Sequence, residues 1–309
     1  MDFDAVLVSA RKERMLKQGY WQNKTMMQSL HEAAEKYPEK EALVSFRTEN
    51  KQQISLNFKE ILELTNKIAL GLKQLGVEKN DVVSCQLPNW WEFSLLYFAC
   101  SRIGAVLNPL MPIFRERELE FMLKHAESKV FIVPKQYRNF DHEQLANKLQ
   151  AKLETLQHVV VVNGLGDNNY DQILVNHGLE KNPEVLTQLD NFHADPDDVT
   201  QLIFTSGTTG EPKGVMHTSN TLYANIVPYA ERLHLNENDV ILMASPMAHQ
   251  TGFMYGLIMP VILQAKVVLQ DVWEVSQAVA LIHQHQVSLT MASTPFLNDL
   301  ANMVAEHHD

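Results

Sequence analysis

Strand-like and helix-like segments alternate along most of this chain. Residues 159–162 are an unbroken run of valines, which is typical of a parallel strand buried on both faces. Comparable β-rich runs occur at residues 42–46, 54–56, 81–86, 105–108, 130–133, 200–204, 240–244, 266–269 and 288–291. Segments with helical periodicity separate most of these runs. The alternation therefore predicts an α/β fold of mostly parallel sheet with helices on both faces.

Several helical segments carry their own start and stop signals. Asn57 is placed to cap a helix that reaches residue 75, and Gly76 follows as the residue that ends it. A second helix is predicted over residues 91–103, directly before Gly104. Further helices are expected at residues 115–125, 143–153 and 294–305. Residues 164–197 have a weaker pattern that is rich in Asn and Asp, so we expect surface connections there.

Composition and charge narrow the kind of protein without indicating a reaction. The 309 residues are 45% apolar and 20% charged, which is the balance of a globular chain that can bury a core. The formal net charge of −11 argues against a broad nucleic-acid surface. This net charge does not exclude one local phosphate site, because backbone N–H groups and one lysine can hold a phosphate.

The cysteines and the amino-terminal segment indicate a cytoplasmic protein. Cys85 and Cys100 lie in apolar stretches and are interpreted as buried thiols in a reducing cytosol. The first residues place acids before bases, unlike a signal peptide, and no apolar run is long enough for a transmembrane segment. Apart from one histidine discussed below, the histidines show no metal-ligand spacing, and we expect surface positions for His142, His283, His285, His307 and His308.

The segment TQLIFTSGTTGEPKGV, residues 200–215, carries the strongest chemical signal. An apolar strand enters a loop of glycines and hydroxyl residues, and Lys213 and a predicted helix follow. Glycines let the backbone approach a ligand closely, and consecutive N–H groups in such a loop form a concave site for an anion. The loop therefore suits a polyphosphate.

Two simpler interpretations compete for this loop. A Gly/Ser/Thr cluster after a strand is often only a turn. The ordinary P-loop places a hydroxyl residue directly after its lysine to hold Mg²⁺, whereas Gly214 follows Lys213 here, so that motif fails.

The same segment resembles the signature of the adenylate-forming superfamily, which contains acyl-CoA synthetases, firefly-type luciferases and the adenylation domains of peptide synthetases. The likeness runs over a dozen contiguous residues, including Pro212, Gly214 and Val215. Further landmarks of the superfamily follow one another in the right order at residues 55–61, 87–89, 99–110 and 246–252. One departure is Ser219, which stands where the superfamily usually has a histidine. Thr218 and Ser219 can still cap the following helix.

The resemblance implies roles for particular residues. Lys213 and His249 are the candidate catalytic residues, with a solvated surface lysine and a capping or core histidine as the alternatives. The hydroxyl of Thr205 would approach Mg²⁺, an ion that prefers oxygen ligands. The phosphates of ATP would be held by Thr205, Ser206, Gly207, Thr208, Thr209, Gly210 and Lys213. The acid pocket would be formed by His249, Gln250, Thr251 and Gly252, and we expect the glycine to leave space for the acid.

The resemblance also implies that the chain is the front part of a longer enzyme. We find no Tyr-Gly-x-Thr-Glu segment, no Thr-Gly-Asp segment and no Gly-Arg-x-Lys hinge. We therefore expect residues 1–309 to be a partial N-terminal AMP-binding domain that lacks its C-terminal part and is inactive alone. In the superfamily two mostly parallel sheets are stacked, so we expect one sublobe of residues 77–197 and a second of residues 1–76 plus 198–309.

The resulting hypothesis is an acid:CoA ligase. ATP and a carboxylic acid would give acyl-AMP and pyrophosphate, and CoA would then displace AMP. Residues 86–93 and 245–256 look most like ligases for short- or medium-chain fatty acids or cyclohexanecarboxylate. Aryl-acid ligases of the dihydroxybenzoate type are the first alternative, and a non-catalytic nucleotide-binding fragment is the second. Nucleic acid is not an expected partner, and a homodimer is possible.

Overall fold

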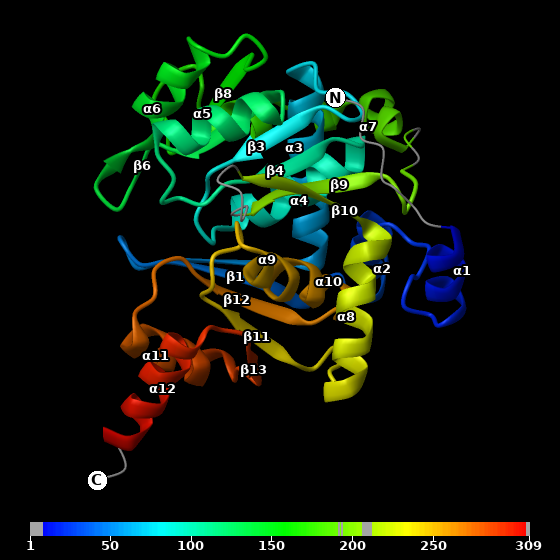
Figure 1. Cartoon of the computed structure of the whole chain (residues 1–309), viewed down its shortest axis with the longest axis vertical. Helices are drawn as coiled ribbons and strands as arrows, with labels where there is room; N and C mark the ends of the chain where they lie inside the picture. The colour runs from blue at the N-terminus through cyan, green and yellow to red at the C-terminus, as the bar shows by residue number, and fades with distance from the viewer. Residues whose placement is uncertain (1–8, 191, 193, 206–211, 307–309) are drawn as a thin grey trace.

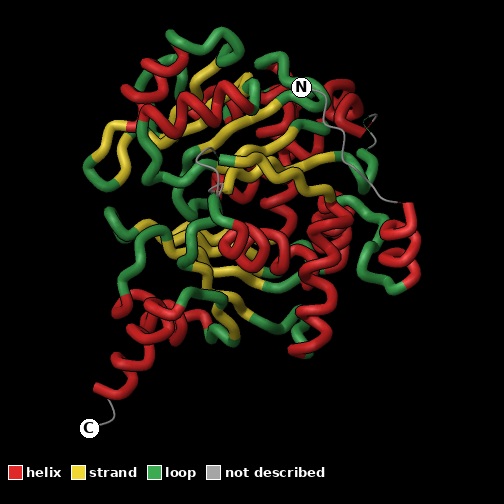
Figure 2. The backbone as a smooth tube through the Cα atoms, in the orientation of Figure 1, coloured by secondary structure: helices red, strands yellow, loops and turns green. Residues whose placement is uncertain are grey.

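A computed structural model describes residues 9–190, 192, 194–205 and 212–306 of this chain. Two β-sheets lie one above the other, with helices packed against and between them (Figure 1). Figure 2 shows the strands of these sheets as two separate groups surrounded by helices. Two stacked, mostly parallel sheets are what the sequence led us to expect, so that prediction is confirmed.

The lower sheet in Figure 1 has five strands in the order β13-β11-β12-β1-β2. The pairs β13–β11, β11–β12 and β12–β1 are parallel, and β2 returns antiparallel to β1 through a tight turn. The strands are β1 (Glu41–Arg47), β2 (Gln52–Asn57), β11 (Val240–Met243), β12 (Lys266–Gln270) and β13 (Leu289–Thr290).

The upper sheet has six strands in the order β10-β9-β4-β3-β5-β8, and only β10 is antiparallel to its neighbour. A short hairpin of β6 (Gln136–Tyr137) and β7 (Phe140–Asp141) projects beside it. The six strands are β3 (Val82–Cys85), β4 (Val106–Pro109), β5 (Ser128–Pro134), β8 (His158–Val162), β9 (Val199–Thr205) and β10 (Lys213–Thr218).

One helix joins the two sheets. All residues of α4 (Trp91–Ile103) except Trp91 and Arg102 are buried, and the helix contacts β1 of the lower sheet and β4 and β9 of the upper one. Such a helix needs apolar side chains around its whole circumference, which the sequence WEFSLLYFACSRI largely supplies. The two free cysteines, Cys85 and Cys100, are buried in the same core, as expected.

The remaining helical elements connect the strands and pack against the sheets or between them (Figure 1). They are α1 (Ser9–Lys17), α2 (Met26–Lys36), α3 (Phe58–Gln74), α5 (Glu116–His125), α6 (His142–Gln150), α7 (Pro183–Asp190), α8 (Ser219–Leu233), α9 (Gln250–Phe253), α10 (Met259–Leu263), α11 (Val275–His285) and α12 (Thr294–Glu306), with π-helices at Asp171–Val175 and Met254–Ile258 and a 3-10 turn at Leu179–Lys181. None of the helices in the described ranges is both long and apolar enough to cross a membrane.

The predicted helix ends are present. Asn57 caps α3, because its Oδ1 accepts from the N–H of Glu60 at 2.8 Å while Glu60 Oε2 accepts from the N–H of Asn57, also at 2.8 Å. Gly104 ends α4 in the left-handed conformation, with φ +72°, which favours glycine. Thr218 likewise caps α8.

Two expectations require correction, and one strand was not predicted. Strands β9 and β10 belong to the sheet of residues 82–162, not to the lobe of residues 1–76, because Gln201 pairs with Leu107 of β4 and Val199 and Leu202 pack with that sheet. The strand β10, at residues 213–218, was not predicted: it folds back on β9 before α8 starts at Ser219. His142 is buried, not exposed, whereas His307 and His308 lie outside the described residues.

Candidate functional site

The hairpin of β9 and β10 brings Thr205 and Lys213 together. They are paired residues at its loop end, where Thr205 Oγ1 lies 3.5 Å from the carbonyl oxygen of Lys213. Both residues are exposed. The predicted phosphate-binding residues between them, Ser206, Gly207, Thr208, Thr209 and Gly210, lie outside the described residues. The structure therefore places the two ends of the predicted loop at one point of the upper sheet.

His249 starts the helix α9, directly after the loop that leaves β11. Its N–H donates to the carbonyl of Pro246 at 2.9 Å, and its ring Nδ1 accepts from the N–H of Thr251 at 3.3 Å. The ring is exposed and caps the helix. In a neutral imidazole, an accepting Nδ1 places the proton on Nε2. His249 therefore presents an N–H toward solvent while its other nitrogen holds the helix start.

A pair of glutamines links these two segments. Nε2 of Gln201, a fully buried residue of β9, donates to Oε1 of Gln250 at 3.2 Å. Gln201 precedes Thr205 on the strand that enters the loop, and Gln250 directly follows His249. Strand β9, which leads into the glycine-rich loop, and the histidine segment are far apart in the sequence but are therefore neighbours in the fold.

Gly252 does not open space for a ligand, so our expectation for it was wrong. A Cβ at this position would lie 2.2 Å from the carbonyl oxygen of Pro246 and 2.5 Å from that of Ser245. The first turn of α9 thus rests directly on the backbone of residues 245–246. Glycine is needed here for close packing of one main chain on another.

The helix that follows His249 contains a π-helical turn at Met254–Ile258. Pro260 has no N–H to donate to the carbonyl four residues earlier, and its ring clashes with that carbonyl, so the helix widens there. Gly256 faces Met243 of β11 in this turn, where an added Cβ would lie 2.4 Å from Met243 Cγ. The irregular helix is therefore pressed closely onto the lower sheet.

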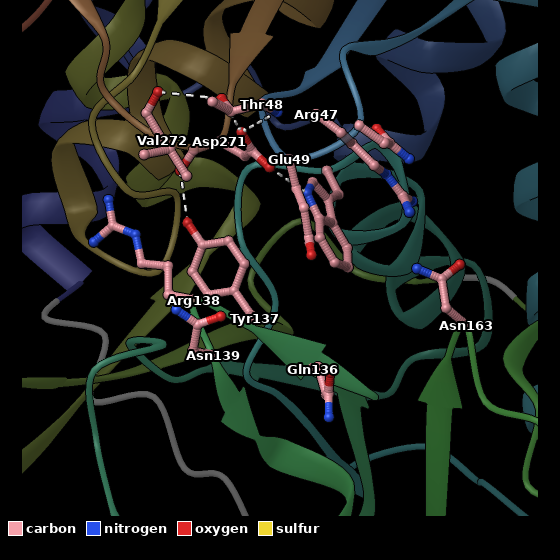
Figure 3. Close-up of a pocket in the computed structure, with 12 residues that line it drawn as sticks. Arg47, Thr48, Glu49, Gln136, Tyr137, Arg138, Asn139, Asn163, Asp271 and Val272 are labelled. Carbon is pink, nitrogen blue, oxygen red and sulfur yellow. Dashed lines mark hydrogen bonds between the residues drawn. The ribbon is translucent and has the colours of Figure 1, made fainter.

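Two cavities lie where the carboxyl ends of the strands of both sheets meet. The first has a volume of about 220 Å³ and is lined by residues that follow β1, β5, β8 and β12 (Figure 3). The second, of about 240 Å³, follows β3, β4 and β11 and has an apolar wall that includes Leu87, Met111, Pro246 and Phe296. The carboxyl edge of parallel strands is where ligands bind in doubly wound folds.

Tyr137, Arg138 and Asp271 line both cavities. The Tyr137 hydroxyl donates to the carbonyl oxygen of Asp271 at 2.8 Å, and Asp271 Oδ2 accepts from Trp90 Nε1 at 2.9 Å (Figure 3). Asp271 Oδ1 accepts from both the N–H and the hydroxyl of Thr48. Burial raises the pKa of Tyr137 to about 12, so the hydroxyl keeps its proton and acts as a donor.

This network could not be predicted from the sequence. Its four members, Thr48, Trp90, Tyr137 and Asp271, come from four separate segments, and the network does not form a short motif. Arg47, which stacks over Trp90 with 4.1 Å between Cζ and the ring centroid and forms a buried ion pair with Glu92, was equally invisible as a pattern. Among the described residues, no cluster of three or more His, Cys, Asp or Glu could hold a metal ion.

Comparison with known proteins agrees with this architecture. A solved long-chain-fatty-acid-CoA ligase from Archaeoglobus fulgidus superposes with a TM-score of 0.77 at 27% identity, covering 92% of this chain and 54% of that one. The fold is that of the N-terminal domain of an adenylate-forming enzyme. Residues 30–309 match the family described as AMP-binding enzyme, and the chain belongs to that family.

Two curated relatives differ in the acid that their names give. The medium-chain fatty-acid–CoA ligase of Escherichia coli K12 is 31% identical over 95% of this chain and 50% of its own length. The 2,3-dihydroxybenzoate-AMP ligase of Bacillus subtilis 168 is 28% identical over 92% of this chain and 50% of its own length. The chain spans about half the length of the curated relatives that it matches.

Proposed function

We propose that the protein containing this chain activates a carboxylic acid with ATP and transfers the acyl group to CoA. The observation that carries the proposal is the contact between Gln201 and Gln250, which sets the strand entering the glycine-rich loop beside the segment of His249. A loop suited to a polyphosphate and a segment suited to an acid must be neighbours if the acid is to attack ATP. Membership of the AMP-binding enzyme family supports the same chemistry.

In the proposed first step, a carboxylate oxygen attacks the α-phosphorus of ATP and the bond to the bridging oxygen breaks, giving acyl-AMP and pyrophosphate. The loop of residues 205–213 would hold the β- and γ-phosphates, with Lys213 offsetting charge that builds on the leaving group. The Thr205 hydroxyl would face the Mg²⁺ that accompanies ATP. No general base is required, because a carboxylic acid is already ionised at neutral pH. In the second step, the CoA thiolate attacks the acyl carbon and AMP leaves.

The acid is proposed to be a short- or medium-chain fatty acid or an alicyclic acid. The Escherichia coli relative, at 31% identity, is named for medium-chain fatty acids. The Gln250 side chain, which is next to His249 and could pair with a hydroxyl on an aryl acid, has a partner within the protein, because its Oε1 accepts from Gln201. A second candidate, an aryl acid, is favoured by the name of the Bacillus subtilis relative.

The proposal is tested with the full-length enzyme. Acid-dependent pyrophosphate–ATP exchange and thioester formation would be measured with butyrate, hexanoate, cyclohexanecarboxylate, benzoate and 2,3-dihydroxybenzoate. We expect exchange and thioester formation with hexanoate or cyclohexanecarboxylate. Exchange with none of the acids would contradict the activity, and a clear preference for dihydroxybenzoate would contradict the acid class.

A further inference from the structure

Asn89 follows a strand of the upper sheet and hydrogen-bonds to the backbone that leads from the lower sheet to His249. The upper lobe is here the upper sheet with its helices, and the lower lobe is the lower sheet with its helices. Asn89 lies in the connection between β3 and α4, and it is 2% exposed. Its Nδ2 donates to the carbonyl oxygen of Ser245 at 2.9 Å and lies 3.3 Å from that of Gln270 and 3.4 Å from that of Met243. Its Oδ1 accepts from the N–H of Met247 at 2.8 Å. The donor and acceptor ends of one buried amide are thus both occupied by the backbone of the opposite lobe.

These contacts come where the backbone leaves a strand. Residues beyond the end of β11 lose the partners of the sheet ladder, and buried backbone groups that lack partners are costly. Asn89 supplies both a donor and an acceptor at this point. The next residue, Trp90, donates to Asp271, and the N–H of Trp91 donates to Ser45 Oγ at 3.2 Å, so the same turn is also tied to β12 and β1.

The other side of the segment is held by α9. The backbone of residues 245–246 lies against Gly252, with no room for a side chain between them. Residues 245–247 are therefore held between Asn89 on one side and Gly252 on the other, and His249 follows two residues later. The position of His249 relative to the upper sheet depends on the contacts of residues 245–247 with Asn89 and Gly252 and on the Gln201–Gln250 hydrogen bond.

We propose that Asn89 is a positioning residue for the acid site: it fixes the Pro246–His249 segment of the lower lobe to the upper lobe, which carries the phosphate loop. The proposal rests on the proposed function for its catalytic consequence. Asn89 acts through the backbone of the segment and not on the substrate itself. Its amide is required as a donor, since three carbonyl oxygens lie around Nδ2.

The requirement for a donor predicts an unusual order of substitutions. Asp has nearly the shape of Asn but presents an oxygen to those carbonyls, so the two would repel each other. Ala leaves a gap that the segment can relax into. If Asn89 only filled volume, Asn89→Asp would be the milder change. We expect the reverse.

The experiment compares Asn89→Ala and Asn89→Asp with Asn108→Ala in the full-length enzyme. Asn108 is a matched control, because its side chain is fully buried in β4 and Nδ2 donates to Ser84 Oγ at 2.8 Å, within the upper sheet. Deuterium uptake would be followed in peptides covering residues 243–252 and, as a reference, residues 128–134. KM and kcat would be measured separately for the acid and for ATP by pyrophosphate–ATP exchange.

In both Asn89 variants we expect deuterium exchange in residues 243–252 to be at least about tenfold faster, while deuterium exchange in the reference peptide stays unchanged. The KM for the acid should rise at least about fivefold while the KM for ATP stays within about twofold, and Asp should be worse than Ala. Asn108→Ala should leave residues 243–252 and the acid KM unchanged.

Three results would overturn the proposal. They are unchanged deuterium exchange in residues 243–252, faster deuterium exchange there without a change in the KM for the acid, and a milder effect of Asn89→Asp than of Asn89→Ala. Failure of the proposed function would look different, because the unmodified enzyme would then show no acid-dependent pyrophosphate–ATP exchange at all. The deuterium measurement would still report on the role of Asn89 in that case.

Discussion

His142 and Gln86 form a buried pair in which the orientation of the amide determines the state of the imidazole. Gln86 Nε2 donates to the carbonyl oxygens of Met111 and Phe114 at 2.9 and 3.0 Å, so Oε1 faces His142 Nδ1 at 3.0 Å. Nδ1 must therefore carry the proton. His142 Nε2 is buried and has no hydrogen-bond partner among the described residues. Burial, with a smaller contribution from Arg115, lowers the pKa of His142 to about 4.

This pair predicts a pH-dependent loss of stability. Between the unfolded pKa of about 6.5 and the folded value of about 4, the unfolded chain binds a proton at His142 that the folded chain does not. Stability due to His142 is thus complete above pH 6.5 and decreases as the pH falls to 4, by at most ~1.4 kcal/mol per pH unit. The free energy of unfolding would be measured with urea at pH 4.5, 5.5, 6.5 and 7.5. It should fall less steeply with decreasing pH for His142→Gln than for the unmodified chain. The exposed His283, changed to Gln, is the control, and equal slopes for His142→Gln and the unmodified chain would contradict the prediction.

Lys213→Ala should weaken the reaction without weakening the fold. Lys213 is exposed at the loop end of the β9–β10 hairpin, so its loss should leave the midpoint of thermal unfolding unchanged. A lost charge-assisted phosphate contact costs about 1.5–3 kcal/mol, or roughly ten- to a hundredfold in kcat/KM for ATP. Pyrophosphate–ATP exchange by the full-length enzyme measures this loss. Lys124→Ala, which removes another exposed lysine, should have no effect on exchange, and equal activity of the two variants would argue against a role for Lys213.

Gln250→Ala should leave the preference among aliphatic acids almost unchanged. Oε1 of Gln250 accepts from Gln201, so its main partner belongs to the protein. The ranking of butyrate, hexanoate and cyclohexanecarboxylate would be compared in the two enzymes. If the substrate were instead a hydroxylated aromatic acid held by Gln250, its hydroxyl would lose a partner at a cost of about 1–3 kcal/mol. A dihydroxybenzoate activity that collapses in the variant would be that contrary result.

Gly252→Ala should destabilise the protein. The added methyl group would lie 2.2 Å from the carbonyl oxygen of Pro246, so either α9 or the segment of residues 245–246 must move. Overpacking of this kind typically costs about 1–3 kcal/mol. Gly166→Ala is the matched control, because the nearest atom to its Cβ would be Asn168 Oδ1 at 3.4 Å, an ordinary contact. Equal urea midpoints for the two variants would show that the close packing at Gly252 can relax at little cost.

Most elements of the fold could be predicted from local pattern, because the signals for them lie within a few residues of each other. Asn57 and Glu60 form a capping box within one turn, and Gly104 follows its helix directly. The valines of β8 show burial on both faces for the same reason. The glycine-rich loop could be recognised because its residues are contiguous. Local pattern did not show that Lys213 begins a strand, since a short polar strand after a glycine loop has no periodicity to reveal it.

The sequence by itself thus determined most of the helices and strands and the family that they resemble, and it indicated the loop that we propose holds a phosphate. Only the tertiary structure decided which sheet β9 and β10 join, that His142 is buried, and that Gly252 supports a backbone rather than opening a pocket. It also decided the contact of Asn89 with Met247, 158 positions later. The physical reason is that periodicity records whether a residue is buried, whereas the identity of the neighbour that buries it depends on how distant segments pack.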